Sequence, residues 1–343
     1  MTEREAQATW RLFEVNWLVL ALLAAVMGVS FTAFGFSFGL SGALVSYGFV
    51  AIYTGFACYN AKAPHRRDPQ VVYVLGATGQ IIFATCILAP LSYVAAAANL
   101  PLQDAALQAI DQALGLNWLA YVEFVNARPL LAEWLTLGYT MIQWPIFFIP
   151  VVLAAADRYQ RLQEFVLAFT LALAVTVVIS TFVPAIGVFY HLGLDVTDFP
   201  NINGGAYLGQ LRDLPLVRDG SLRHLELFGL AGLITFPSFH AASAALYAWA
   251  FWPVRWFRPV ALASNGAMLA ATPITGGHYF IDIIGGVAIA ALAIVAARNV
   301  SRRIAQRVAP QDACPSPQEV SQAASYRIQS AAPDAVTASR TQS

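Results

Sequence analysis

Long apolar runs bounded by charged residues dominate the chain. Crossing a hydrocarbon core of about 30 Å takes roughly 20 apolar residues in a helix, and eight runs approach that length. The pattern therefore predicts an all-α fold, a polytopic transmembrane helical bundle of about eight spans. The two runs between residues 239 and 275 are the shortest. The expected spans are approximately 16–36, 40–61, 71–98, 132–155, 164–189, 239–255, 259–275 and 279–298.

Two longer segments interrupt these runs. In the first, residues 99–133, apolar residues recur at spacings of three and four, which predicts an amphipathic helix lying on the membrane surface. The second, residues 190–236, is rich in Gly, Asp and Arg, and we expect a long loop that caps a site. The apolar positions of the first segment are Leu107, Ile110, Leu114, Trp118, Tyr121 and Val122.

Three regions follow from this pattern. Residues 1–98 are expected to be N-terminal transmembrane helices, and residues 99–308 a second membrane domain, which contains the motifs with candidate catalytic chemistry described below. Residues 309–343 contain few large apolar side chains, which predicts a disordered cytoplasmic tail.

Composition supports the membrane assignment. Hydrophobic residues make up 58% of the chain and charged residues only 11%, against about 25% in soluble domains. The formal net charge is zero, so nothing indicates a nucleic-acid partner. The cysteines, Cys58, Cys86 and Cys314, are widely spaced and support neither a disulfide framework nor a zinc site. We expect no cofactor.

The distribution of basic residues predicts an orientation, because short cytoplasmic loops collect Lys and Arg. Both termini are expected in the cytoplasm, and the first apolar run is expected to be a retained span. The inside segments would hold Arg4, Arg11, Lys62, Arg66, Arg67, Arg158, Arg161, Arg255, Arg258, Arg298, Arg302, Arg303 and Arg307. The outside segments would hold only Arg128, Arg212, Arg218 and Arg223.

The candidate chemistry lies in two short motifs, residues 236–240 and 276–282, both on the outer side in this topology. His278 and Asp282 are four residues apart, so we expect both on one helical face, where the carboxylate can orient the imidazole. His240 is expected in the first turn of another helix, where free amide groups favour an anion. This arrangement suits displacement at phosphorus: one histidine attacks, and the other protonates the leaving alkoxide.

Phosphate oxygens need cationic or amide partners. Arg218 is the first candidate and Arg212 and Arg223 are weaker ones, although Arg218 could instead pair with Asp213 or Asp219. Ser238 is a further candidate for phosphate contact through its backbone amide, and its hydroxyl has the place of a helix cap. A metal site formed by the two histidines and Asp282 would need a further ligand such as Asp219 or Glu226, and we expect no metal.

The two motifs resemble the type-2 phosphatidic acid phosphatase superfamily. Phe-Pro-Ser-x-His paired with His-Tyr-Phe-x-Asp is most similar to the branch of inositol phosphorylceramide synthases and sphingomyelin synthases, and the segment 111–118 is also like bacterial members of that branch. The resemblance implies that His278 is the nucleophile, Asp282 its orienting partner and His240 the acid. Thr272 stands six residues before His278, where the phosphatase pattern has a Ser-Arg pair. The first phosphatase motif, a lysine followed after six residues by Arg-Pro, has no match because the region contains no lysine.

These departures favour a transferase that moves an inositol-phosphate type of head group between lipids. The lipid and the bilayer would be its partners, the oligomeric state stays open, and we expect a bacterial inner membrane with the site on the periplasmic face. Two alternatives remain. One is a hydrolase of the same superfamily acting on lipid phosphates or isoprenyl diphosphates, and the other is a transporter in which the ionisable residues form a path.

Overall fold

The computed structural model describes residues 2–62 and 68–308, and almost all regular structure in these ranges is helical. The all-α prediction is therefore confirmed. The tail predicted for residues 309–343 lies outside the described residues. The α-helices are α1 (Glu3–Phe34), α2 (Leu40–Lys62), α3 (Pro69–Ala97), α4 (Asp104–Ala113), α5 (Trp118–Asn126), α6 (Pro129–Thr140), α7 (Trp144–Ala155), α8 (Tyr159–Phe182), α9 (Val188–Leu192), α10 (Gly205–Asp219), α11 (Phe239–Phe251), α12 (Arg258–Thr275) and α13 (Phe280–Val308). Short elements are the strands β1 (Ser37–Phe38) and β2 (His224–Leu225) and the 3₁₀ turns η1 (Val196–Asp198) and η2 (Arg255–Phe257).

Five helices in the described ranges are long and apolar enough to cross a membrane, namely α1, α2, α3, α8 and α13. The count rises to six if α6 and α7, which meet at a bend of 63°, form one broken span. The chain is thus an integral membrane protein, but the count of about eight spans is not confirmed. With 13 residues, α11 covers only about 20 Å, less than the hydrocarbon core.

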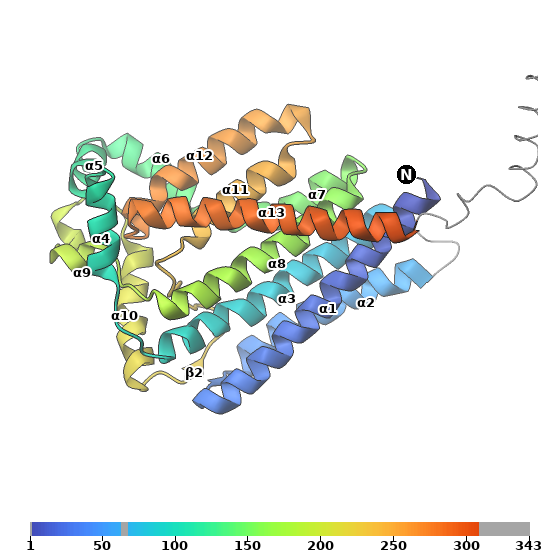
Figure 1. Ribbon diagram of the computed structural model, residues 1–343, viewed down its shortest axis with the longest axis horizontal. Helices are drawn as coiled ribbons and strands as arrows, with labels where there is room; N and C mark the ends of the chain where they lie inside the picture. The colour runs from blue at the N-terminus through green and yellow to red at the C-terminus, as the bar shows by residue number, and fades with distance from the viewer. Residues whose placement is uncertain (1, 63–67, 309–343) are drawn as a thin grey trace, which may run out of the picture.

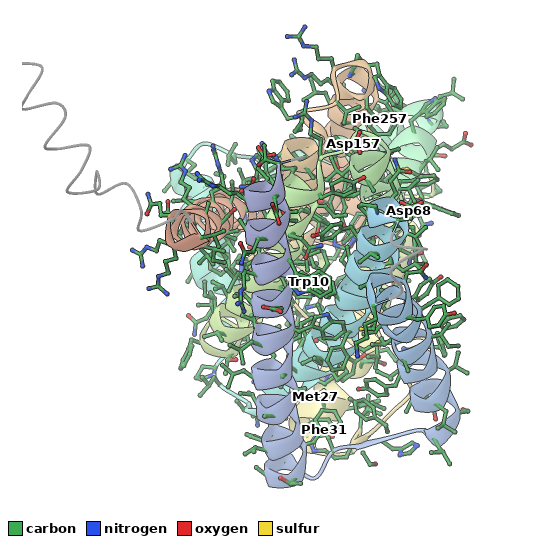
Figure 2. The ribbon with its side chains drawn as sticks, turned by 90° about the vertical axis from the view of Figure 1, so that its right-hand side faces the viewer. Trp10, Met27, Phe31, Asp68, Asp157 and Phe257 are labelled. Atoms are coloured by element: carbon green, nitrogen blue, oxygen red, sulfur yellow. The ribbon has the colours of Figure 1, made fainter. Side chains whose placement is uncertain are left out.

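The long helices form one bundle. Figure 1 shows α1, α3, α8 and α13 side by side, with α4, α5, α9 and α10 gathered at one end. The N-terminus and the last turns of α13 lie at the opposite end. In Figure 2, Asp68, Asp157 and Phe257, which lie one or two residues before α3, α8 and α12, are toward the end away from Phe31. The bundle therefore has two distinct ends, one of which carries the short helices.

Buried amide side chains join the helices within the bundle. Asn16 Nδ2 donates to Gln163 Oε1 at 3.0 Å, and Gln80 Nε2 donates to the carbonyl of Phe13 at 3.0 Å. Hydrogen bonds of this kind within a bundle contribute about 0.6 kcal/mol each on average. They fix the register of α1 against α3 and α8 more than they add to stability.

The amphipathic helix predicted for residues 107–122 is two helices. Gly115, at φ +73°, separates α4 from α5. The buried face of α4 carries Asp104, Leu107 and Asp111, whereas Ile110 and Leu114 are 42% and 53% exposed. The face of α4 toward the protein therefore carries two carboxylates that accept hydrogen bonds, and Ile110 and Leu114 lie outside it. Contact of these exposed apolar side chains with the membrane surface stays a prediction.

The segment 190–236 is more ordered than the predicted loop. It contains α10, and its strand β2 pairs in parallel with β1, with Ser37 opposite His224 and Phe38 opposite Leu225. This pairing ties the segment to the connection between α1 and α2. The remainder of the segment runs from β2 directly into α11 without further regular structure.

Candidate active site

His278 and Asp282 form a buried pair. His278 Nδ1 and Asp282 Oδ2 are 3.1 Å apart, and the two side chains are 5% and 0% exposed. The helix begins only at Phe280, so His278 lies in the turn before α13 and not on a shared helical face. The carboxylate reaches back from the first turn of the helix, and it also accepts the amide of Tyr279 at 2.9 Å.

This contact determines which histidine nitrogen is available for chemistry. A carboxylate acceptor at Nδ1 favours the tautomer that carries its proton there, which leaves the lone pair on Nε2. Within the described residues, no protein group forms a hydrogen bond with His278 Nε2. The pair therefore presents an unprotonated nitrogen held in one orientation.

The turn that carries His278 is fixed by close backbone contacts. Gly277 has φ +66°, and its carbonyl accepts the amide of Val188 at 2.9 Å. A Cβ on Gly277 would lie 3.0 Å from the ring of Tyr207, so the segment 190–236 does lie against this turn. Glycine is needed here both for the positive φ and for the close approach of the ring.

Asp111 caps α13 from the neighbouring helix α4. Its two carboxylate oxygens accept the amides of Phe280 and Ile281 at 2.7 and 2.8 Å. Burial raises the pKa of this carboxyl, while the two amide bonds oppose the increase. The amides at the start of α13 are thus already satisfied by the protein, and a phosphate would have to bind elsewhere.

Asp104 lies seven residues before Asp111 on α4 and contacts the other side of the same turn. It accepts the hydroxyl of Tyr279 at 2.9 Å and the amides of Ile186 and Gly187 at 3.1 and 2.8 Å. In the sequence, Asp111 stands out only as the first residue of the segment 111–118, which resembles bacterial family members, and Asp104 was not predicted as a site residue. Their spacing of seven residues was a signal, since it places two carboxylates on one helical face.

His240 lies at the start of α11, close to the start of α13. The amide of Ser238 donates to the carbonyl of Asp282 at 3.0 Å, which joins the two helix starts directly. A Cβ on Gly286 would lie 2.2 Å from the carbonyl oxygen of Ser238. Glycine at this position therefore permits the close approach of α11 and α13 that brings the two motifs together.

Tyr139, on α6, links the two histidines. Its ring stacks on the ring of His240, with centroids 4.0 Å apart and an interplanar angle of 15°. A Cβ on Gly276 would lie 2.9 Å from Tyr139 Oη and 3.1 Å from His278 Nε2, so both atoms lie next to Gly276. Nothing in the sequence pattern singles out Tyr139, because its position depends on how α6 packs against α12.

The geometry can be compared with known families. The model of the PAP2 superfamily matches residues 105–296, which is more than half of the 343 residues. The chain belongs to the PAP2 superfamily. The matched range contains His240, His278 and Asp282 together with Asp111 and Tyr139. A search of curated proteins and a search of solved structures each found no match.

The predicted phosphate-binding residues of this PAP2 protein have other contacts in the structure. Arg218 Nη2 donates to the carbonyl of Leu100 at 2.9 Å, and its buried Nη1 has no partner among the described residues. Arg212 forms an ion pair with Asp213. Arg223 donates to the carbonyls of Val217 and Leu222. None of these contacts joins an arginine to His240, His278 or Asp282.

Ser238 is the N-cap of α11, and its hydroxyl accepts the amide of Ala241 at 3.4 Å. Because its own amide donates to Asp282, the amide is not available for a phosphate in this conformation. In the described structure, the next two amides, of Phe239 and His240, have no hydrogen-bond acceptor. The open helix start beside His240 therefore offers free amide donors to an anion.

Proposed function

We propose that this PAP2 protein is a membrane phosphotransferase that moves an inositol-phosphate type of head group between lipids through a phosphohistidine on His278. The hydrogen bond between His278 Nδ1 and Asp282 Oδ2 is the observation that carries the proposal, because it leaves Nε2 as an oriented nucleophile. The contact of α11 with α13 supports it, since it brings His240 to the same end of the bundle.

In the first step, Nε2 of His278 attacks the phosphorus of the donor lipid. The P–N bond forms as the P–O bond to the leaving alkoxide breaks, and His240 gives a proton to that alkoxide. Burial and the nearby His278 lower the pKa of His240, so this step requires the anionic phosphate of the bound donor to raise that pKa. Asp282 stabilises the positive charge that develops on the ring of His278.

The second step reverses these roles. The neutral His240 takes the proton from the hydroxyl of the acceptor lipid, whose oxygen attacks phosphorus. The P–N bond breaks, the electron pair returns to His278, and the enzyme is ready for another donor. Both steps require the non-bridging oxygens to be held, and we assign this to the free amides at the start of α11 together with Arg218, Ser238 and Arg212. Ser238 would first have to release the carbonyl of Asp282, to which its amide donates.

The arginine part of this assignment requires a rearrangement. Arg218 would have to leave the carbonyl of Leu100, and Arg212 would have to leave Asp213. The unpartnered Nη1 of Arg218 favours Arg218 over Arg212, since a buried donor without an acceptor gains most from a phosphate oxygen.

A lipid phosphate or isoprenyl diphosphate phosphatase is the second candidate, and PAP2 membership favours it equally at the level of reaction class. The first step would be unchanged, and water would replace the lipid hydroxyl in the second. The two activities differ only in which acceptor reaches the phosphohistidine.

The test uses the purified full chain and a panel of labelled phospholipids, with and without inositol or ceramide-like acceptors. A new phospholipid identifies the transferase, and release of inorganic phosphate alone identifies the phosphatase. We expect His278→Ala and Asp282→Ala each to lower turnover about a thousandfold or more, as in other histidine-carboxylate sites. Full activity in both variants would refute the mechanism, and His191→Ala, an exposed histidine on α9, is the matched control.

We further propose a bacterial inner membrane location, with both termini in the cytoplasm and the histidines facing the periplasm. The support comes from the charge distribution along the chain and from the bundle, in which the N-terminus and the last turns of α13 lie together at one end. Lipid donors and acceptors would then reach the site from the outer leaflet.

A further inference from the structure

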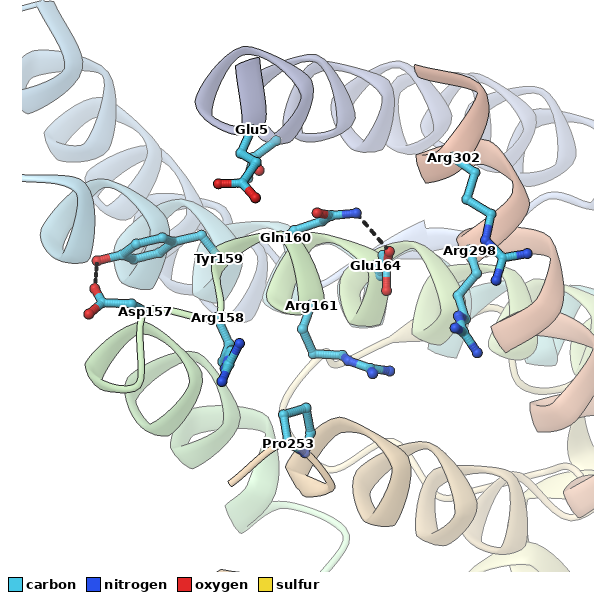
Figure 3. A pocket seen from close by; sticks show the side chains of 11 residues that line it. Glu5, Asp157, Arg158, Tyr159, Gln160, Arg161, Glu164, Pro253, Arg298 and Arg302 are labelled. Atoms are coloured by element: carbon cyan, nitrogen blue, oxygen red, sulfur yellow. Dashed lines mark hydrogen bonds between the residues drawn. The ribbon is translucent and has the colours of Figure 1, made fainter. Parts of the chain in front are cut away.

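A polar cavity lies at the end of the bundle opposite the histidines. It has a volume of about 550 Å³ and is bounded by the starts of α1 and α8, the last turns of α13 and Pro253. Figure 3 shows its side chains. Arg298 lies 18 residues after Phe280 on α13, so about 27 Å of helix separates it from the His278 turn.

Four arginines line this cavity, Arg158, Arg161, Arg298 and Arg302, and we call it the arginine pocket. Figure 3 shows Arg161 of α8 extending toward Arg298 of α13. The guanidinium of Arg161 lies 4.2 Å from the ring centroid of Trp249, and this stacking holds it in place. Its Nη1 is buried and has no hydrogen-bond partner in the described part of the chain.

The three carboxylates that line the pocket accept hydrogen bonds from groups other than its arginines. Glu5 accepts the amide of Thr2 at 2.8 Å, Asp157 accepts the hydroxyl of Tyr159 at 2.8 Å, and Glu164 accepts Gln160 Nε2 at 3.3 Å. Within the described residues, none of the four arginines forms an ion pair with a carboxylate. Four guanidinium groups thus line one cavity, and none of them is paired with a carboxylate in the described part of the chain.

The start of α8 adds further donors. Arg158 is the residue before the helix, and no side chain caps this start. The first amides of a helix have no acceptor within the helix, and the helix dipole places partial positive charge there. The pocket therefore combines four cations, an unpartnered buried donor and free amides, all of which favour a multiply charged anion with several acceptor oxygens.

We propose that the arginine pocket binds a phosphate group, carried by an anionic phospholipid of the adjacent leaflet or free in solution. Phosphate is favoured because its oxygens match paired guanidinium donors, and basic pockets between helices at a membrane surface bind anionic head groups. A volume of about 550 Å³ accommodates a complete glycerophosphate head group. This site is separate from the histidine site and does not depend on the reaction proposed there.

The test measures binding to the purified full chain in a neutral detergent, by native mass spectrometry and by the shift in unfolding midpoint. The probes are short-chain phosphatidylglycerol, short-chain phosphatidylcholine and inorganic phosphate. We expect phosphatidylglycerol to bind and phosphatidylcholine not to compete with it. Binding of the lipid without binding of inorganic phosphate identifies a lipid site, and binding of inorganic phosphate alone identifies a site for the free anion.

Matched double variants separate the pocket from general surface charge. Arg298→Gln with Arg302→Gln removes two pocket arginines, and we expect about a tenfold or greater loss of affinity. Arg255→Gln with Arg303→Gln removes the same charge from exposed positions outside the pocket, and we expect affinity to change less than about twofold.

Two results would overturn the proposal: equal losses in the two double variants, or no binding of either phosphatidylglycerol or inorganic phosphate. Unfolding midpoints without ligand establish that both variants fold. If one variant is unstable, Arg298→Gln alone and Arg303→Gln alone provide the same comparison, because both residues are exposed on α13. Catalytic activity is not part of the readout, so failure of the catalytic proposal leaves this test intact.

Discussion

Gly276 leaves the space that the side chain of His278 occupies. A Cβ at this position would lie 2.5 Å from His278 Cδ2, which is too close for any real contact. The backbone of Gly276, at φ −91°, is accessible to any residue, so space and not conformation requires glycine here.

Gly276→Ala is therefore expected to displace the imidazole and lower turnover about a hundredfold, since displacements near 1 Å have this effect on oriented groups. Gly266→Ala on the same helix is the control, because no atom lies within 4 Å of its Cβ position. We expect Gly266→Ala to keep full activity. The measurement is the turnover number of each variant from steady-state kinetics. Equal turnover in Gly276→Ala and Gly266→Ala would mean that displacement of the His278 ring does not lower activity.

Tyr139 positions His240 through ring stacking. Tyr139→Phe keeps the ring that stacks on His240, and we expect this variant to retain activity. Tyr139→Leu removes the stacked ring. We expect Tyr139→Leu to lower kcat about tenfold with little change in KM, because the proposed proton transfer by His240 takes place only during the reaction. Equal losses in both variants would instead assign the role to the hydroxyl near His278 Nε2.

At the scale of secondary structure, α4 serves as the cap of α13. Asp111 accepts both amides at the start of α13, and Asp104 of the same helix accepts the hydroxyl of Tyr279. Helix α4 is thus a structural part of the turn that carries His278 and not only a surface element.

Asp111→Ala leaves two amides without an acceptor, and loss of such a cap costs about 1–2 kcal/mol. We expect a lower midpoint of thermal unfolding in detergent and a loss of activity, because the turn that carries His278 loosens. Gln112→Ala, one residue away on the exposed face, is the matched control. An unchanged midpoint in Asp111→Ala would show that water replaces the carboxylate without cost.

At the scale of the whole molecule, the bundle separates the histidine site from the arginine pocket. The short helices and the starts of α11 and α13 lie at one end, and the start of α8 and the last turns of α13 lie at the other. Among the described residues, the buried ionisable groups concentrate toward these two ends. The transporter alternative would need such groups at intermediate depths as well.

The orientation can be tested with single cysteines in a variant without Cys58, Cys86 and Cys314. Ser221→Cys, next to the end of α10, should react with an impermeant thiol reagent from the periplasmic side. Gln306→Cys, near the end of α13, should react only after the membrane is opened. The reverse labelling pattern would invert the proposed topology.

The sequence by itself determined the helical class and the pairing of His278 with Asp282. Both depend on local information: apolar runs of sufficient length predict helices in a membrane, and a spacing of four residues keeps two side chains close. The same local reasoning gave about eight spans, a count that the structure does not confirm. A run such as 239–255 is apolar enough to resemble a span, but α11 ends at Phe251 after 13 residues.

Only the tertiary structure decided which distant residues complete the site. Tyr139 stacks on His240 because α6 packs against α12, and Asp111 caps α13 because α4 lies across its start. These contacts join residues about 100 or more positions apart, and no spacing rule reaches that far. The partners of Arg218 and Arg212 were likewise set by tertiary contacts, since a guanidinium bonds to the nearest acceptor that the fold provides.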